Sequence, residues 1–462
     1  MSRLLLVLGL LFGTVAADAQ YIRVRLFEGR GGSSARFISN DAAMVVSVDG
    51  TVVATAVPGE VVHVEREGSG LDVSAENVRR SGSSVEIVSD GIVRLRTGRY
   101  NRTYRGAFEI GRSSRGLRIV NRVDVEPYVA SVVATEYPFR EIEGVKAQAV
   151  LARTYALRHR GDHTHYDVED TQRSQVYKGE GVATETTREA ALLTTGQVLR
   201  YGSDLVEAVY SSSSGGHSAN NEDVWNSTPV PYLRGRPDPF DAESPQHRWS
   251  TSADASRVHR ALSRYGSVNA IYPERSTTGH LRRVRLEPVG RTITGSQFRA
   301  AINARLGYRT LLSTNMDVRR SGDRYVFDGG GFGHGVGMSQ YGARGRAKAG
   351  HPYEDILAHY FPGTALGDVE GGSARPLVAA GSYRTRPIRR ADARAGITDS
   401  TAFPIPPADP QPPRRQVVEP DRRPAWVVRE ALPNGDRVRS RPTPRREARD
   451  SAPEETTRRR GW

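Results

Sequence analysis

The chain has 462 residues, 37% of them hydrophobic, which is enough for two or three domains with sizeable cores. Its formal net charge is +14, of which about +9 lies after residue 370. The remainder is therefore only mildly basic, and nucleic acid is not an expected partner. The absence of cysteine excludes disulfides, thiolate metal sites and a lipoprotein anchor in this sequence.

Residues 1–19 have the pattern of a secretory signal peptide. Arg3 supplies the charged start, residues 4–15 are apolar, and Ala17-Asp18-Ala19 matches the small-residue cleavage motif. The apolar stretch is shorter than the roughly 20 residues of a transmembrane helix. We therefore expect an exported protein that begins at Gln20 after cleavage and is located outside the cytoplasm, in the periplasm or cell wall.

Residues 20–119 are predicted to form a β-rich N-terminal region. Short segments with alternating apolar residues are separated by Gly, Asn and Asp, as in antiparallel sheets. The predicted strands cover residues 22–26, 44–48, 61–64, 85–88, 92–96 and 118–120.

Two helices are predicted next, at residues 125–136 and 142–160. Asp124 is a suitable N-cap for the first, and Pro138 ends it because a proline disfavours helical geometry in the preceding residue. The second helix is apolar on nearly all sides and is expected to be buried.

Three basic residues of the second helix recur at intervals of seven. We expect Lys146, Arg153 and Arg160 to form one cationic stripe along it.

The rest of the chain is predicted to alternate helices and strands and then to lose order. Helices are expected at 253–264, 296–306, 339–349 and 353–360, a hairpin around 281–286, and a strand at 325–327. Residues 366–462 are rich in Pro and Arg and are predicted to be a disordered tail. The expected fold class is therefore α+β, with a mixed helix and strand core over residues 120–365.

Glu136 ends the first predicted helix, beside Tyr137 and Pro138. The negative end of the helix dipole raises the pKa of a carboxyl group there, as a general acid near neutral pH requires. The alternative is an ordinary solvated glutamate at a helix end. Most glycosidases also need a second carboxylate. Asp124, Asp170 and Asp223 are candidates that no spacing distinguishes.

Two further segments concentrate glycine with polar residues. The run 329–343 contains His334 but matches neither a dinucleotide-binding nor a P-loop spacing, so a nucleotide site is not expected. A tight structural turn explains this run equally well. The stretch 210–217 with Asp223 offers Ser, His and Asp, but the nucleophile elbow of hydrolases is absent. His163, His165 and Asp167 lack a strong metal-ligand spacing.

Several of these segments, in their order along the chain, resemble the family of stage II sporulation protein D and the amidase enhancer LytB (SpoIID/LytB). The similar strings cover residues 120–138, 145–156, 175–179, 194–198, 210–216, 223–225 and 333–343. The resemblance implies a lytic transglycosylase that cuts MurNAc–GlcNAc bonds of denuded peptidoglycan glycan strands. It places the single acid/base at Glu136, which removes the need for a second carboxylate.

The same resemblance implies the residues that line the substrate cleft. By position they are Gln148, Arg153, Tyr177, Ser212, His334 and Gln340. Some relatives carry cysteine ligands for zinc where this chain has Glu169 and Ser174. We therefore predict no metal and no cofactor.

Two alternatives to the enzyme hypothesis stay open. The first is a non-catalytic enhancer of an N-acetylmuramoyl-L-alanine amidase, whose partner is then that cell-wall amidase. The second is a basic scaffold whose tail contacts an anionic wall polymer or membrane surface.

Overall fold

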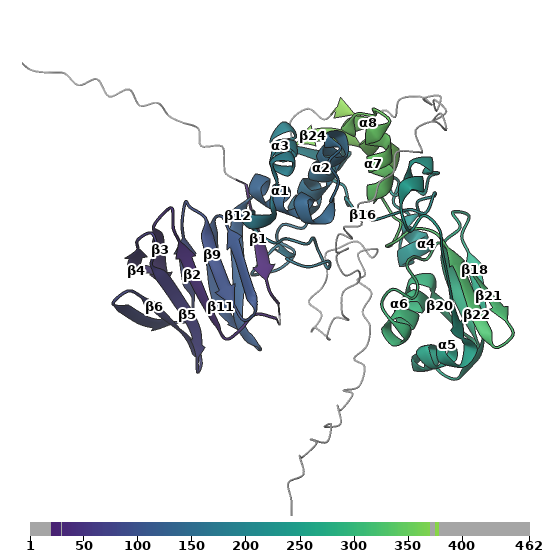
Figure 1. Ribbon diagram of the computed structural model, residues 1–462, viewed down its shortest axis with the longest axis horizontal. Coiled ribbons are helices and arrows are strands. Elements are labelled where there is room, and N and C mark those ends of the chain that lie inside the picture. Colours follow the sequence, from purple (N-terminus) through teal and green to yellow (C-terminus); the bar gives the residue numbers. More distant parts are fainter. Residues whose placement is uncertain (1–19, 29, 370–374, 378–462) are drawn as a thin grey trace, which may run out of the picture.

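The structure is a computed structural model that describes residues 20–28, 30–369 and 375–377. The predicted signal peptide and most of the predicted tail lie outside these residues. Figure 1 shows a β-rich N-terminal part, a central group of helices, and a second lobe of strands and helices. The predicted α+β fold is confirmed.

The N-terminal part consists of two antiparallel sheets packed face to face. The seven-stranded sheet has the order β13-β1-β12-β11-β8-β3-β4, with β13 parallel to β1, and the six-stranded sheet has the order β10-β9-β2-β5-β6-β7. Their bounds are β1 (Tyr21–Leu26), β2 (Ser34–Ser39), β3 (Met44–Val48), β4 (Thr51–Ala56), β5 (Val61–Glu67), β6 (Gly70–Ala75), β7 (Val78–Gly82), β8 (Val85–Val88), β9 (Val93–Thr97), β10 (Tyr100–Tyr104), β11 (Ala107–Ser113), β12 (Gly116–Asp124) and β13 (Val168–Glu169).

Alternation of buried and exposed residues fixes the register of these strands. In β9, Val93 and Leu95 face the core while Arg94 and Arg96 face solvent. All six predicted strands are present in or near their predicted positions. The sheets continue to Asp124, so the boundary predicted at residue 119 falls inside β12.

The central helices follow directly from β12. Helix α1 (Val125–Glu136) has the predicted bounds, although Asp124 occupies the N-cap position without a side-chain capping hydrogen bond. Helices α2 (Ile142–Arg158) and α3 (Glu185–Leu193) pack against α1. The core of the N-terminal sheets continues into these helices as one cluster of buried residues.

The predicted cationic stripe along α2 is not formed. Arg153 is completely buried, and Lys146 pairs with Glu143 at 2.7 Å. Arg160 lies beyond the end of the helix. The stripe does not form because other elements surround α2 on this side. A cation is buried there only when an anionic or hydrogen-bonding partner accompanies it.

The second lobe has its own hydrophobic core, contributed by residues between Ala253 and Phe327. Two three-stranded sheets, β17-β22-β21 and β18-β19-β20, pack with helices α5 and α6. The bounds are β17 (Trp249–Asp254), α5 (Ala255–Leu262), β18 (Val268–Arg275), β19 (Leu281–Pro288), β20 (Arg291–Thr294), α6 (Gly295–Leu306), β21 (Met316–Ser321) and β22 (Arg324–Gly329).

The chain returns from this lobe to the central helices. The short strand β16 (Tyr210–Ser211) pairs in parallel with β23 (Met338–Ser339). The remaining elements of this part are β14 (Gln197–Tyr201), β15 (Asp204–Leu205), α4 (Asn221–Trp225), α7 (Gln340–Lys348), α8 (Tyr353–Tyr360), β24 (Ala365–Asp368) and β25 (Arg375–Pro376), with 3₁₀ turns at Glu180–Val182, Pro239–Glu243 and Ser263–Tyr265.

The predicted start of the tail at residue 366 is wrong. Strand β24 pairs with β14, and β25 pairs with β24, so the ordered sheet extends to Pro376. Leu366 is buried there, which a purely compositional prediction of disorder does not detect. Over the described ranges, we find no helix that combines the length and apolar character needed to cross a membrane.

Candidate active site

Glu136 is the last residue of α1, and its carboxylate is held by the segment that follows β13. The amide of Val176 donates a hydrogen bond of 2.7 Å to Oε1 of Glu136. This segment is fixed against α1, because Gln175 accepts from the hydroxyl of Tyr128 at 2.9 Å and donates to the hydroxyl of Tyr210 at 3.2 Å. The carboxyl group of Glu136 is therefore positioned by backbone and by buried tyrosines.

Burial raises the pKa of Glu136 from its ordinary value of 4.5 to about 7, while the Val176 amide and the charge of Lys178 oppose this rise. The helix dipole, from which the sequence predicts such a rise, also acts on this carboxyl group. That effect is worth about 0.3–1 kcal/mol, which is less than one pKa unit. Desolvation is therefore the main cause, and the helix end contributes the position rather than most of the shift.

A second contact to Glu136 comes from the start of α7. The side-chain amide of Gln340 donates to the carbonyl oxygen of Glu136 at 2.7 Å. Gln340 is placed by its neighbour Ser339, the N-cap of α7, whose hydroxyl accepts from the amide of Gly342 at 3.0 Å. This cap satisfies a donor that the first turn of the helix leaves without an internal partner.

The parallel pairing of β16 with β23 brings two more predicted residues into the same region. His334 donates from Nε2 to the carbonyl of Tyr210 at 2.9 Å, and its Nδ1 accepts from the amide of Val336 at 3.1 Å. This pair of contacts selects the Nε2–H tautomer. Ser212 accepts through its carbonyl from the amide of Tyr341 at 3.1 Å.

His334 is thus fixed by backbone groups on both ring nitrogens. The Trp225 ring lies 5.4 Å from the imidazole, centroid to centroid. We interpret His334 as a residue that shapes the site rather than one that exchanges protons with substrate.

Three of the predicted cleft residues are buried inside the protein instead. Arg153 forms an ion pair with Glu126 at 2.5 Å, and its side chain has no exposed area. Tyr177 is 1% exposed and donates its hydroxyl to Asn121 at 2.8 Å. Gln148 is also fully buried, with no hydrogen-bond partner for its amide among the described residues. These three side chains therefore lie in the interior of the described structure, where they support the fold, and a role for them in lining the cleft stays a prediction.

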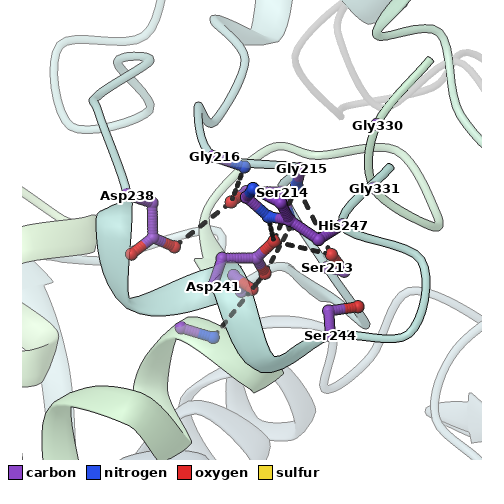
Figure 2. A network of polar contacts seen from close by, with 12 residues as sticks. Ser213, Ser214, Gly215, Gly216, Asp238, Asp241, Ser244, His247, Gly330 and Gly331 are labelled. Carbon is purple, nitrogen blue, oxygen red and sulfur yellow. Dashed lines mark hydrogen bonds and ion pairs between the residues drawn. The ribbon is translucent and has the colours of Figure 1, made fainter. Parts of the chain in front are cut away.

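Asp241 organises the serine-rich loop between β16 and α4 (residues 212–220), and no sequence motif indicates this aspartate. Figure 2 shows its carboxylate at the centre of a polar network. It accepts hydrogen bonds from the hydroxyls of Ser213 at 2.7 Å and Ser339 at 2.6 Å, and from the amide of Gly215 at 2.9 Å. The network therefore ties the serine-rich loop to the N-cap of α7, next to Gln340.

Asp238 supports the same loop from one turn earlier. It accepts from the hydroxyls of Tyr360 at 2.7 Å and Ser214 at 3.2 Å. Burial raises its pKa to about 6. In the sequence, only the three-residue spacing of Asp238 and Asp241 in a proline-containing turn points to these two residues. Their burial depends on the tertiary structure and cannot be predicted from the spacing.

The hydrolase triad considered from sequence is not assembled. Ser213 and Ser214 hydrogen-bond to aspartates, while the Nδ1 of His217 contacts the carbonyl of Ser218 at 2.7 Å. Asp223 is bonded to Asn220 at 3.0 Å.

The two positions that carry zinc-ligating cysteines in some relatives lie next to each other. The amide of Glu169 donates to the hydroxyl of Ser174 at 3.2 Å, and the Glu169 carboxylate lies 3.8 Å from Arg173. Within residues 20–28, 30–369 and 375–377, no three His, Asp or Glu side chains form a group that could hold a metal ion.

Comparison with known proteins places this arrangement in a family. The family model described as stage II sporulation protein matches residues 113–201, which include α1 and α2. The chain is 33% identical to stage II sporulation protein D of Bacillus subtilis (strain 168) over 274 residues, which cover 54% of this chain and 76% of the relative. It is 31% identical to the protein of the same name from Bacillus amyloliquefaciens over 278 residues, with the same two coverages.

A further relative is the amidase enhancer of Bacillus subtilis (strain 168). It is 30% identical over 290 residues, which cover 51% of this chain but only 39% of that longer protein. The similarity to stage II sporulation protein D of Bacillus subtilis covers about three quarters of that relative, and the family-model match includes Glu136. The chain therefore belongs to the SpoIID/LytB family.

Proposed function

We propose that this protein cleaves peptidoglycan glycan strands as a lytic transglycosylase, with Glu136 as the only acid/base. The observation that carries the proposal is the buried Glu136 carboxyl group with a pKa of about 7. It accepts a hydrogen bond from the Val176 amide, while Gln340 at the start of α7 holds the backbone carbonyl of Glu136. A carboxyl group with this pKa exists in both protonation states near neutral pH, and both are needed in one catalytic cycle.

The protonated carboxyl group donates its proton to the glycosidic oxygen between MurNAc and GlcNAc as the bond from C1 of MurNAc to that oxygen breaks. The resulting carboxylate accepts the proton of the 6-hydroxyl of the same MurNAc, whose oxygen forms a new bond to C1. The products are a 1,6-anhydro end and a free 4-hydroxyl. Glu136 ends the cycle protonated, and no water is consumed.

The deciding experiment is product analysis on denuded glycan strands. The purified protein is expected to release anhydro-sugars, and Glu136→Gln is expected to release none, because glutamine cannot donate the proton. Glu189→Gln is a matched control, because this exposed carboxylate of α3 does not line the cavity of the second lobe and loses its charge in the same way. Anhydro product from the Glu136→Gln variant would contradict the assignment.

A second candidate is an enhancer of a cell-wall amidase, which the similarity to an amidase enhancer supports. In that case the protein binds glycan strands and stimulates a separate N-acetylmuramoyl-L-alanine amidase. An amidase assay with and without the protein distinguishes the two. Stimulation that Glu136→Gln leaves intact, without anhydro product, favours the enhancer.

Both candidates place the protein outside the cytoplasm, where its substrate is found. Contact of the basic C-terminal segment with an anionic wall polymer or membrane surface is a separate proposal. Removal of residues 378–462 tests it through the fraction of protein that sediments with isolated cell walls.

A further inference from the structure

A cavity of about 720 Å³ lies on the second lobe and does not include Glu136. Its walls come from the serine-rich loop, from the start of β17, from the β18–β19 turn, and from the β21–β22 pair. The lining residues include Trp249, Arg248, Gly216, Arg275, Asp317 and Gly329. A cavity of this volume accommodates a ligand of one to a few sugar rings.

The aromatic residue of the cavity is held in a fixed orientation. Trp249 begins β17 and is paired with Gly329 of β22. Its indole N–H donates to the carbonyl of Gly331 at 3.0 Å. A Cβ at Gly329 would lie 2.4 Å from Cζ2 of Trp249, so the ring lies against the glycine backbone. Trp249 is only partly buried and lines the cavity. Its indole ring therefore presents a flat apolar surface to the cavity.

The cavity also contains one cation that lacks a carboxylate partner. Arg275 pairs with Asp317, and Asp328 pairs with Arg319 at 3.3 Å. Exposed Arg248 instead donates to the backbone carbonyls of Gly215 at 2.6 Å and His247 at 2.9 Å. Among the described residues, no carboxylate forms an ion pair with it, so its charge is available to an anionic group of a ligand.

Gly330 provides the space in which Arg248 lies. A Cβ at this position would come within 2.9 Å of Nη1 of Arg248 and 2.7 Å of the carbonyl of His247. Only a glycine leaves room for the guanidinium here, and Arg248 and Trp249, which are consecutive in sequence, both line the cavity.

Two chain segments connect this cavity with the Glu136 site. The loop that provides Gly215 and Gly216 to the cavity starts at Tyr210, which contacts His334 and Gln175. The run that provides Gly329 and Gly330 continues to Gln340. Tyr210 and Gly216 are six residues apart, a span of at most about 22 Å. A linear polymer that occupies one site can therefore reach the other.

We propose that this cavity is a distal glycan subsite that binds an acidic N-acetylhexosamine of the same strand that Glu136 acts on. The apolar face of the pyranose ring stacks on Trp249, and the carboxylate of its lactyl ether pairs with Arg248. This inference rests on the proposed function for the identity of the polymer, while the site itself is defined by its own residues.

The test measures binding separately from cleavage. In the full chain carrying Glu136→Gln, dissociation constants are measured by calorimetry for denuded GlcNAc–MurNAc oligosaccharides of two and eight sugars, and for a neutral GlcNAc octamer. The longer acidic strand is expected to bind more tightly than the short one. Trp249→Ala should raise the Kd of both octamers about tenfold, the loss that corresponds to ~1.4 kcal/mol.

Arg248→Gln distinguishes the acidic ligand from the neutral one. It should raise the Kd of the MurNAc-containing octamer several-fold and leave that of the GlcNAc octamer unchanged. Tyr272→Ala is the matched control, because Tyr272 is 50% exposed on the same lobe, carries Arg285 over its ring, and does not line the cavity. Circular dichroism checks that each variant folds. If Trp249→Ala does not fold, the variant Arg248→Gln at an exposed position provides the test.

The outcomes separate the two proposals. Unchanged dissociation constants in both variants overturn the subsite, whether or not the wild-type protein makes anhydro product. Loss of binding in Trp249→Ala and Arg248→Gln, without anhydro product from the wild-type protein, supports the subsite and contradicts the proposed cleavage.

Discussion

The side chain of Gln340 donates a hydrogen bond of 2.7 Å to the carbonyl of Glu136, across a sequence separation of 204 residues. One partner ends α1 and the other begins α7, so the bond joins the glycine-rich run 329–343 to the end of the helix that carries the proposed catalytic carboxyl group. The whole second lobe lies between these partners in sequence. The two partners can therefore meet only where the chain returns from that lobe to the central helices.

The pKa of Glu136 predicts the pH dependence of cleavage. The general acid must be protonated when substrate binds, and burial raises the pKa of this carboxyl to about 7. We expect kcat/KM to be constant below that pH and to fall about tenfold per unit above it, measured as anhydro-sugar release between pH 5 and 9. Activity that rises from pH 7 to pH 9 contradicts the assignment, and binding of a GlcNAc octamer over this range is the control.

The same group predicts a pH-dependent gain in stability for Glu136→Gln. Its pKa is about 7 in the folded protein and 4.5 ordinarily, so its stabilising contribution is complete below 4.5 and is lost as the pH rises through 7. The variant should therefore exceed the wild-type free energy of unfolding by about 1–3 kcal/mol at pH 8.5 and match it at pH 4.5. Urea titrations at both pH values measure this, with exposed Glu189→Gln as control. A variant that is less stable at pH 8.5 would show that the carboxylate is well solvated.

Asp241→Asn should weaken the loop that carries the site. An asparagine retains one acceptor oxygen where the fully buried aspartate accepts from Ser213, Ser339 and Gly215. Loss of two charged hydrogen bonds is expected to cost about 2–4 kcal/mol and to reduce cleavage through displacement of Gln340. Asp254→Asn is the comparison, since this half-exposed residue pairs with Arg324 at the surface and should change stability by less than ~1 kcal/mol. Equal losses in the two variants would contradict a special role for Asp241.

Glu126→Gln tests whether Arg153 stabilises the interior or contributes to the cleft. The substitution leaves the fully buried guanidinium without its ion-pair partner, although Glu126 itself is 32% exposed. We expect a loss of about 2–4 kcal/mol, partly recovered in the double variant Glu126→Gln with Arg153→Met. The Kd for glycan oligosaccharides should be unchanged in the double variant. A large increase of that Kd would return Arg153 to the binding site.

Arg96→Glu should stabilise the N-terminal sheets. Arg96 of β9 lies directly opposite Arg36 of β2, and both are exposed. Like charges in this position repel, whereas a glutamate opposite Arg36 attracts it, with a gain of about 0.2–1 kcal/mol. The gain should shrink in 1 M NaCl because salt screens exposed charges. Arg99→Glu, at the adjacent turn, provides the control, and a loss of stability in low salt would contradict the pairing.

Local patterns predicted the elements that carry the site but not all of its residues. The bounds of α1 follow from Pro138 and the apolar run before it, both of which act within a few residues. Gln340 contacts Glu136, while Ser212 and His334 are bonded to Tyr341 and Tyr210 in the neighbouring segments. Gln148, Arg153 and Tyr177 do not join them, because motif membership does not reveal whether a side chain faces a cleft or the core.

The sequence by itself determined the α+β class, the alternation of the N-terminal strands and the positions of most helices, since these depend on periodicity and turn residues. Only the tertiary structure decided the burial that raises the pKa of Glu136, the ion pair of Arg153, the Asp241 network and the cavity beside Trp249. Each of these depends on contacts between residues far apart in the chain, such as Glu136 with Gln340 or Trp249 with Gly329. Such contacts form only after the sheets and helices have packed.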